Sequence, residues 1–182
     1  MSLLGRWTDL IYKIATGSWK VKVILAPIAG TLFLSLIAFF ILLSLAVDRW
    51  LSLPKVFYYH LSPIIGSCLI VCGLFLMLFS IAYFLRVRGT PVPLSPPPKL
   101  VTSGPYRFTR NPMLTGLFIL LFGLSIVLGS LSLAFIFTPL FIIFNVWELK
   151  KVEEPELARR LGKAYLEYKK RVPMFFPSLT KK

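Results

Sequence analysis

Histidine, cysteine and acidic residues are scarce in this sequence. Its 182 residues include one His, two Cys and seven Asp or Glu. A structural zinc site takes four ligands of the His and Cys type, so a closed site of that kind cannot be built here. The two cysteines, Cys68 and Cys72, stand four positions apart in an apolar run, where they would share a helix face and make poor disulfide partners. We predict that they pack as small apolar side chains and that the protein holds no metal.

Several sequence signatures of common enzymes are also missing. The chain has no GxGxxG motif, no P-loop and no serine-nucleophile motif. These absences exclude the common soluble cofactor folds and hydrolases, but leave the reaction open. Residues 1–22 contain four basic residues and no apolar core, so we expect no cleavable signal peptide and interpret the first apolar run as an anchor.

Apolar and basic residues are abundant instead. The chain is 57% hydrophobic with a mean hydropathy of +0.78, and its 21 Lys and Arg give a formal net charge of +14. A basic excess suits either nucleic acid or an anionic membrane surface. The long apolar runs favour the membrane, and no nucleic-acid-binding motif appears. We therefore expect membrane lipids, and no nucleic acid, as partners.

The apolar runs predict an all-α, polytopic membrane protein with four transmembrane helices. We place the spans at about residues 23–47, 63–85, 112–128 and 131–146. Residues 1–22 are predicted to form an amphipathic N-terminal segment, and residues 23–182 a single membrane domain. That domain ends in a cytosolic helix over 150–172, also amphipathic and interfacial. In the second span, Gly66, Ser67, Gly73 and Ser80 are small residues suited to close helix packing.

The distribution of basic residues predicts the orientation in the membrane. Lys and Arg are concentrated before the first span, between spans two and three, and after span four, whereas the turn near residue 130 has none. The positive-inside rule therefore places both termini and the proline-rich loop over 86–105 in the cytosol.

Two polar groups are expected to meet at that cytosolic face. One stands at the start of the third span and the other follows the end of the fourth, and the two helices are antiparallel neighbours. They are Tyr106, Arg107, Arg110 and Asn111 in the first group, and Glu148, Glu153 and Glu154 in the second. Arginine clamps carboxylates or phosphates, while carboxylates bind an ammonium or a ribose diol. The residues alone leave a second interpretation open, in which the arginines contact lipid phosphates and the glutamates cap a helix.

Several motifs in order carry a family resemblance. They are Arg88-Gly-Thr-Pro-Val-Pro93, Leu100-Val-Thr-Ser-Gly-Pro-Tyr-Arg107, Arg110-Asn-Pro-Met113 and Glu153-Glu-Pro-Glu-Leu157, followed by Leu161-Gly162, Tyr165, Tyr168 and Val172-Pro173. Over roughly residues 62–177 the chain resembles the isoprenylcysteine carboxyl methyltransferase family, which is related to the membrane phospholipid N-methyltransferases. Asn111 stands where the eukaryotic members have His, and Leu114 where Tyr is usual. The asparagine resembles a prokaryotic branch, which implies a plasma membrane rather than the endoplasmic reticulum.

The resemblance implies an integral-membrane methyltransferase that uses S-adenosylmethionine and releases S-adenosylhomocysteine. The implied cofactor-binding residues are Gly104, Tyr106, Arg110, Asn111, Pro112, Met113, Glu153 and Glu154. The implied catalytic residues are Arg110, Glu154 and Tyr106. The expected acceptor is lipophilic, either a prenylcysteine-like carboxylate or a phospholipid amine. The alternative is a non-enzymatic membrane scaffold or anionic-lipid-binding protein. A transporter is disfavoured by four spans without intramembrane charge.

Overall fold

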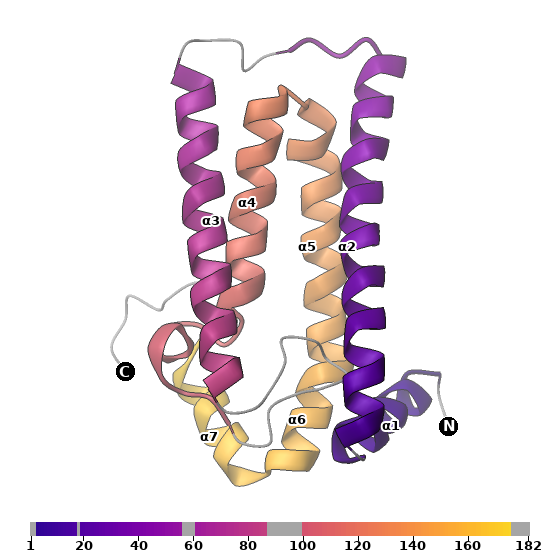
Figure 1. Ribbon diagram of the computed structural model, residues 1–182, viewed down its shortest axis with the longest axis vertical. Coiled ribbons are helices and arrows are strands. Elements are labelled where there is room, and N and C mark those ends of the chain that lie inside the picture. The colour runs from indigo at the N-terminus through magenta and orange to yellow at the C-terminus, as the bar shows by residue number, and fades with distance from the viewer. Residues whose placement is uncertain (1–2, 18, 56–60, 87–99, 176–182) are drawn as a thin grey trace.

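The computed structural model is helical throughout the part of the chain that it describes, which comprises residues 3–17, 19–55, 61–86 and 100–175 (Figure 1). No strand occurs in those ranges, and the predicted all-α class is confirmed. The elements are α1 (Leu3–Thr16), α2 (Trp19–Trp50), α3 (Leu61–Arg86), the 3-10 turn η1 (Gly104–Arg107), α4 (Pro112–Leu128), the π-turn η2 (Leu133–Phe137), α5 (Thr138–Glu148), the π-turn η3 (Leu149–Glu153), α6 (Glu154–Leu161) and α7 (Lys163–Arg171). Most of the predicted proline-rich loop lies outside the described residues.

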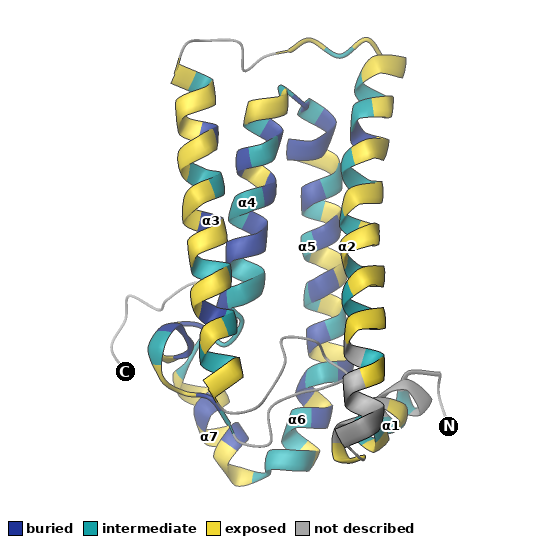
Figure 2. Ribbon diagram, viewed as in Figure 1, coloured by how far each residue is buried: buried dark blue, intermediate teal, exposed yellow. Residues whose placement is uncertain are grey.

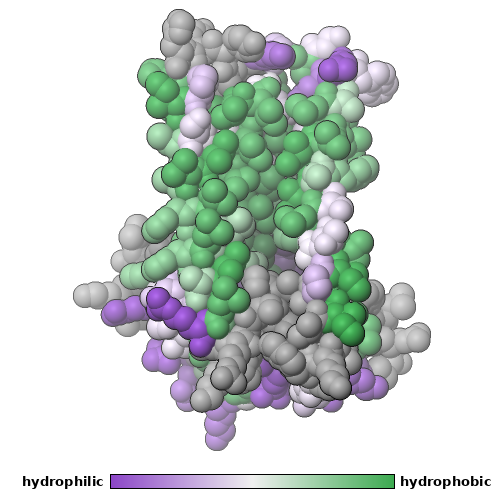
Figure 3. Space-filling model, viewed as in Figure 1, coloured by the Kyte–Doolittle hydropathy of each residue, from purple (hydrophilic) through white to green (hydrophobic). Residues whose placement is uncertain are grey.

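Within the described residues, three helical stretches are long and apolar enough to cross a membrane: Pro27–Trp50, Leu61–Arg86 and Leu133–Leu161. The predicted span over 112–128 coincides with α4, an apolar helix of 17 residues that is shorter than those three. A four-span count therefore remains a prediction. Large apolar side chains are exposed along α2 and α3 and form a wide hydrophobic band on the molecule (Figures 2 and 3). A band of this extent is expected of an integral membrane protein, where lipid covers it.

The helix that contains the fourth predicted span continues far beyond residue 146. Helical structure runs from Leu133 to Leu161. The charged residues after Trp147 make the helix polar there but do not end it. It ends at Gly162, whose φ of 58° lies in the left-handed region that favours glycine. The predicted surface helix over 150–172 is consequently divided here, and α7 folds back beneath the bundle (Figure 1).

Helices α3 and α4 pack together at two pairs of glycines. A Cβ atom on Gly73 would lie 2.5 Å from the carbonyl oxygen of Gly116, and one on Gly66 would lie 2.9 Å from that of Gly123. The two glycines of each helix are seven residues apart, so they face the partner helix together. The predicted role of Gly66 and Gly73 in close packing is confirmed, whereas Ser67 is exposed and does not take part. This contact fixes α3 against the helix that begins at the candidate site.

A buried polar cluster joins α2 to the turn between α4 and η2. Asp48 accepts hydrogen bonds from the Ser130 hydroxyl and, at 2.9 Å, from the Ser132 backbone N–H. The Ser132 hydroxyl donates to the Ser44 carbonyl at 2.8 Å. A carboxylate at a helix N-terminus satisfies N–H groups that lack helical partners. The cluster therefore anchors α2 at the end of the bundle opposite to α6 and α7.

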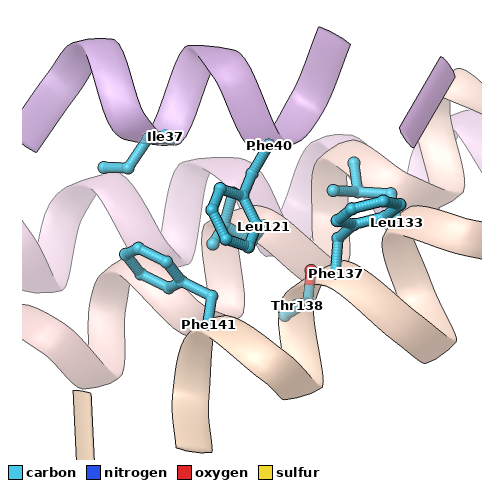
Figure 4. A pocket seen from close by; sticks show the side chains of 7 residues that line it. All are labelled: Ile37, Phe40, Leu121, Leu133, Phe137, Thr138 and Phe141. Carbon is cyan, nitrogen blue, oxygen red and sulfur yellow. The ribbon is translucent and has the colours of Figure 1, made fainter. Parts of the chain in front are cut away.

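The core of the bundle is apolar and closely packed. Its buried centre consists of Leu117, Phe118, Leu121 and Phe141. A cavity of about 10 Å³ lies beside it, which is far below the few hundred Å³ that ligand pockets usually have (Figure 4). The side chains that line it are Ile37, Phe40, Leu121, Leu133, Phe137, Thr138 and Phe141. A polar cofactor therefore has no place there, and the chemistry must be sought at the polar end, which we define as the end where η1, α6 and α7 meet.

The N-terminal helix is attached to the polar end. Arg159 of α6 donates to Asp9 of α1 at 2.7 Å, and its guanidinium lies 4.1 Å from the ring centroid of Tyr12. These contacts hold α1 beside α6, although both partners of the ion pair are largely exposed. The predicted location of α1 at the membrane interface remains a prediction.

Candidate functional site

The polar end brings Arg110 and Glu154 into direct contact, as the sequence predicted. Arg110 lies just before the first turn of α4, and Glu154 begins α6. The Nη1 atom of Arg110 donates to Oε1 of Glu154, and also to the Tyr165 hydroxyl at 3.4 Å. Both charged side chains are about nine-tenths buried, at 11% and 9% exposure. Buried charges are costly unless they are paired, so this contact is central to the site.

Lys169 of α7 adds a second cation to the same carboxylate. Its Nζ lies 2.5 Å from Oε2 of Glu154, and its side chain is 42% exposed. We call Arg110, Glu154 and Lys169 the ion-pair triad. The sequence analysis assigned no role to Lys169, which is one of many basic residues in the helix predicted over 150–172. Its spacing of four from Tyr165 is the signal that places both side chains on one face.

Three buried tyrosines form the wall next to the triad. Burial and, to a smaller extent, the nearby Glu154 carboxylate raise the pKa of Tyr165 to about 12, although Arg110 acts in the opposite direction. Burial also raises the pKa of the Tyr106 and Tyr168 hydroxyls above their ordinary value. All three hydroxyls therefore keep their protons at neutral pH and can donate hydrogen bonds. A raised pKa argues against Tyr106 as a general base.

Tyr106 is the most unusual of the three. It is 4% exposed, and its hydroxyl has no hydrogen-bond partner in the described part of the chain. Its ring packs edge-on against Phe84, with centroids 5.0 Å apart, while its backbone carbonyl accepts a 2.7 Å hydrogen bond from Tyr168. The ring and backbone are thus fixed. A buried hydroxyl without a partner costs free energy, so this donor is available for a ligand.

Glu153 and Glu156 complete the acidic side of the site. The Glu153 carboxylate is half-buried and makes no ion pair or hydrogen bond within the described residues. It lies close enough to Tyr106 to raise the pKa of the tyrosine hydroxyl. Glu156 is 1% exposed and accepts a 2.7 Å hydrogen bond from Arg160. The π-turn η3 ends at Glu153 and shifts the helix register directly before Glu154. Because both oxygens of Glu154 already accept from the triad, Glu153 is the residue whose acceptor oxygens remain available.

The turn that carries Arg110 is held by the C-terminal strap, which we define as residues 172–175. The Arg110 N–H donates to the Pro173 carbonyl at 2.9 Å. The Met174 carbonyl accepts from the Thr109 hydroxyl at 2.8 Å and from the Asn111 N–H and side-chain amide at 3.2 and 3.3 Å. The amide of Asn111, predicted to contact the cofactor, here binds the strap.

The remaining predicted residues support the turn or lie apart from the triad. Gly104 has a φ of 60°, and a Cβ atom there would overlap the ring of Tyr83, so glycine lets η1 approach α3. Pro112 is buried at the first position of α4, and Met113 is half-buried beside it. Leu114 packs against the apolar core instead of reaching the polar end.

Arg107 and Glu148, which the sequence grouped with this site, are not drawn into the triad. Arg107 is exposed, and Glu148 is half-buried at the last residue of α5. Within the described ranges, no group of His, Cys, Asp and Glu is arranged to hold a metal ion.

Comparison with known proteins identifies the family. The model of the phospholipid methyltransferase family matches residues 61–164, which is more than half of the chain. The match includes Tyr106, Arg110, Glu153 and Glu154, and ends before Lys169. No curated protein and no solved structure matches the chain. Family membership implies methyl transfer to lipid-type substrates, for which this family generally uses S-adenosylmethionine. The chain belongs to the phospholipid methyltransferase family.

Proposed function

We propose that the protein is an integral membrane enzyme that transfers a methyl group from S-adenosylmethionine to a lipophilic acceptor at the cytosolic face. The observation that carries the proposal is the buried Arg110–Glu154 contact, which stands beside the unpartnered hydroxyl of Tyr106. Burying charged and polar groups at the end of an apolar helix bundle costs free energy, so such groups mark a functional site.

The side chains at the polar end fit the groups of this cofactor. Its amino-acid part has a carboxylate and an ammonium, and its ribose has two hydroxyls. Arg110 Nε and the Tyr106 hydroxyl are buried donors without a hydrogen-bond partner in the described chain, which suits carboxylate or hydroxyl oxygens. The unpaired carboxylate of Glu153 suits the ammonium or the ribose. The proposed binding set is Gly104, Tyr106, Arg110, Asn111, Pro112, Met113, Glu153 and Glu154.

The residues of this set divide the work. When bound, the cofactor supplies an electrophilic methyl group on a sulfonium. Arg110 binds the cofactor carboxylate, and Glu154 orients Arg110 through the ion pair. Tyr106 donates from the buried wall, and we retain Arg110, Glu154 and Tyr106 as the proposed catalytic residues. Methyl transfer depends mainly on alignment and exclusion of water, which a buried site provides.

The chemistry of the acceptor decides whether a base is needed. A carboxylate acceptor, as in a prenylcysteine, attacks without losing a proton. A phospholipid amine must first lose one, and Glu153 is then the base, because Glu154 is held by two cations and Tyr106 keeps its proton. The acceptor reaches the polar end from the bilayer, along the exposed apolar faces of the helices.

The proposed topology has four spans in a single membrane domain, with both termini in the cytosol of a prokaryotic plasma membrane. The basic residues support this orientation, since they gather at the polar end and in the segments joined to it. A helix of 17 residues covers about 26 Å at 1.5 Å per residue, so α4 reaches across most of a hydrocarbon core of about 30 Å.

Binding of S-adenosylhomocysteine to detergent-solubilised protein tests the proposal. We expect the intact protein to bind and Arg110→Ala to weaken binding at least about tenfold, as loss of a charge-assisted hydrogen bond does. Arg159→Ala is the matched control, because it removes an exposed arginine of α6 that pairs with α1. No binding by the intact protein, combined with salt-sensitive binding to anionic vesicles, would favour the non-enzymatic scaffold.

The acceptor is then identified with a labelled methyl donor. Lipids are extracted from cells with and without the protein and analysed by mass spectrometry. A labelled prenylcysteine ester and a labelled phospholipid headgroup differ in mass and in sensitivity to mild base, which cleaves the methyl ester. A label that appears equally in both kinds of cell would contradict enzymatic activity.

A further inference from the structure

We propose that Lys169 is a further binding residue for the cofactor, and that with Arg110 it forms a two-cation site for the carboxylate of the cofactor's amino-acid part. This inference rests on the proposed function. It goes beyond the region matched by the family model, which ends at residue 164.

The charges of the triad leave one cation uncompensated. Glu154 contributes one negative charge, while Arg110 and Lys169 contribute two positive charges, and all three side chains meet at the two oxygens of one carboxylate. Arg110 is buried, where an excess positive charge is unfavourable without an anion. One further carboxylate in contact with the two cations would neutralise the cluster, and Glu153, which makes no ion pair within the described residues, does not supply that contact. The amino-acid part of the cofactor has one carboxylate.

Both cations retain donors for that anion. The Nε of Arg110 is buried and has no partner within the described residues. Lys169 uses one of the three N–H groups of its ammonium on Glu154, and its side chain is 42% exposed. Arg110 thus forms the buried floor of the site and Lys169 its accessible rim. A ligand that enters from the solvent meets the lysine first.

The position of Lys169 is determined by the fold. The bend at Gly162 turns α7 back under the bundle. Tyr165, one helical turn before Lys169, contacts Arg110, and Tyr168 donates to the backbone of Tyr106. Two neighbours of the lysine are therefore attached to both sides of the candidate site. This attachment holds the ammonium at the site. The ammonium of a lysine on an unattached surface helix would not be held in one place.

A competing role for Lys169 is purely structural, as a counterion for Glu154. The two roles differ in the ligands that they affect. A carboxylate-binding lysine matters for S-adenosylhomocysteine, but not for 5′-methylthioadenosine, which has the same adenosine and thioether and lacks the amino-acid part. A lysine that only positions Glu154 would act through Glu154 and Arg110, so its replacement should have no further effect on S-adenosylhomocysteine binding once Glu154 is replaced by Gln. A lysine that binds the carboxylate directly keeps its effect in that background.

The experiment measures the affinity of both ligands for the intact chain, Lys169→Gln, Lys169→Arg and Lys170→Gln, and for Lys169→Gln in a Glu154→Gln background. Lys170 is the matched control, since it is exposed on the same helix and lies outside the triad. We expect Lys169→Gln to weaken S-adenosylhomocysteine binding by about 5- to 20-fold, the range for a partly exposed charged hydrogen bond. Binding of 5′-methylthioadenosine should change less than about twofold, Lys169→Arg should retain most affinity, and Lys170→Gln should resemble the intact chain.

Equal affinities of Lys169→Gln and Lys170→Gln for S-adenosylhomocysteine would overturn the inference, as would equal loss for both ligands. The absence of any effect of Lys169→Gln in the Glu154→Gln background would also overturn it. Thermal unfolding of each variant without ligand verifies that it is folded, and Lys169→Ala takes the place of Lys169→Gln if the latter is not. Absence of binding by the intact chain would instead refute the proposed function, and the inference with it. The two failures are therefore distinguishable.

Discussion

The Thr109 hydroxyl donates a 2.8 Å hydrogen bond to the carbonyl of Met174, which lies 65 residues later in the chain. The same carbonyl accepts from the Asn111 backbone and side chain, so three donors converge on one oxygen. Arg110 stands between the two donor residues and is itself bound to the Pro173 carbonyl. The turn that presents the key arginine is therefore shaped by the last described residues of the chain.

Thr109→Val should loosen this turn and weaken cofactor binding. The substitution keeps the side-chain shape and removes the donor, and a net hydrogen bond is worth about 1 kcal/mol, or roughly fivefold in affinity if all of it acts on the site. Hydrogen exchange of the Arg110 and Asn111 amides should become faster. Thr109→Ser should restore both properties.

Ser132→Ala is the matched control, because it removes a hydroxyl hydrogen bond of 2.8 Å at the opposite end of the bundle. It should lower the unfolding temperature and leave the affinity for S-adenosylhomocysteine unchanged. A Thr109→Val protein with unchanged exchange rates at residues 110 and 111 would show that the strap does not shape the turn.

Glu154→Gln should destabilise the protein, because it leaves Arg110 buried without a carboxylate. Removing one partner of a buried pair typically costs 3–5 kcal/mol, and we expect about 2–4 kcal/mol here since Lys169 is half-exposed. Denaturant unfolding in detergent measures the loss. The double variant with Arg110→Met should lose less than the sum of the two single variants, and additive losses would contradict a coupled pair.

Much of this architecture follows from the sequence, because its signals are local. Apolar run length predicted the helices, and the small residues Gly66 and Gly73 predicted close helix packing, for which the structure shows α4 as the partner of α3. The contact of Arg110 with Glu154 followed from antiparallel neighbours whose ends must meet. The residue pattern within each segment, together with the order of the segments, was sufficient for these inferences.

The rest depends on tertiary geometry that no local pattern encodes. The role of Lys169 requires α7 to fold back at Gly162, and a glycine in a basic helix does not by itself specify that direction. The pairing of Asn111 with Met174 joins segments 63 residues apart through a backbone carbonyl, which any residue type could supply. The helix through residue 161 was missed because the onset of charge was interpreted as its end.

Gly73→Ala should weaken the packing of α3 against α4. The new Cβ would lie 2.5 Å from the Gly116 carbonyl oxygen, so the backbones must separate, and overpacking of this kind costs about 1–3 kcal/mol. Gly30→Ala is the control, because a Cβ atom at that helical position meets nothing within 4 Å. Its expected effect is neutral or slightly stabilising, since alanine favours helix. Thermal unfolding in detergent compares the two, and equal midpoints would contradict the close contact.

Tyr106→Phe and Tyr168→Phe separate function from stability. The Tyr106 hydroxyl is buried without a partner in the described structure, so removing it should leave the ligand-free protein equally stable or slightly more stable. The Tyr168 hydroxyl makes a 2.7 Å hydrogen bond to the Tyr106 carbonyl, so its loss should cost about 1 kcal/mol. Affinity for S-adenosylhomocysteine should show the opposite ranking, with the larger loss in Tyr106→Phe.

Because burial raises the pKa of the Tyr106 hydroxyl, the loss of affinity in Tyr106→Phe should be constant between about pH 6 and 9, where the hydroxyl keeps its proton. If Tyr106→Phe lowers stability without changing affinity, the hydroxyl serves the fold and does not face the cofactor.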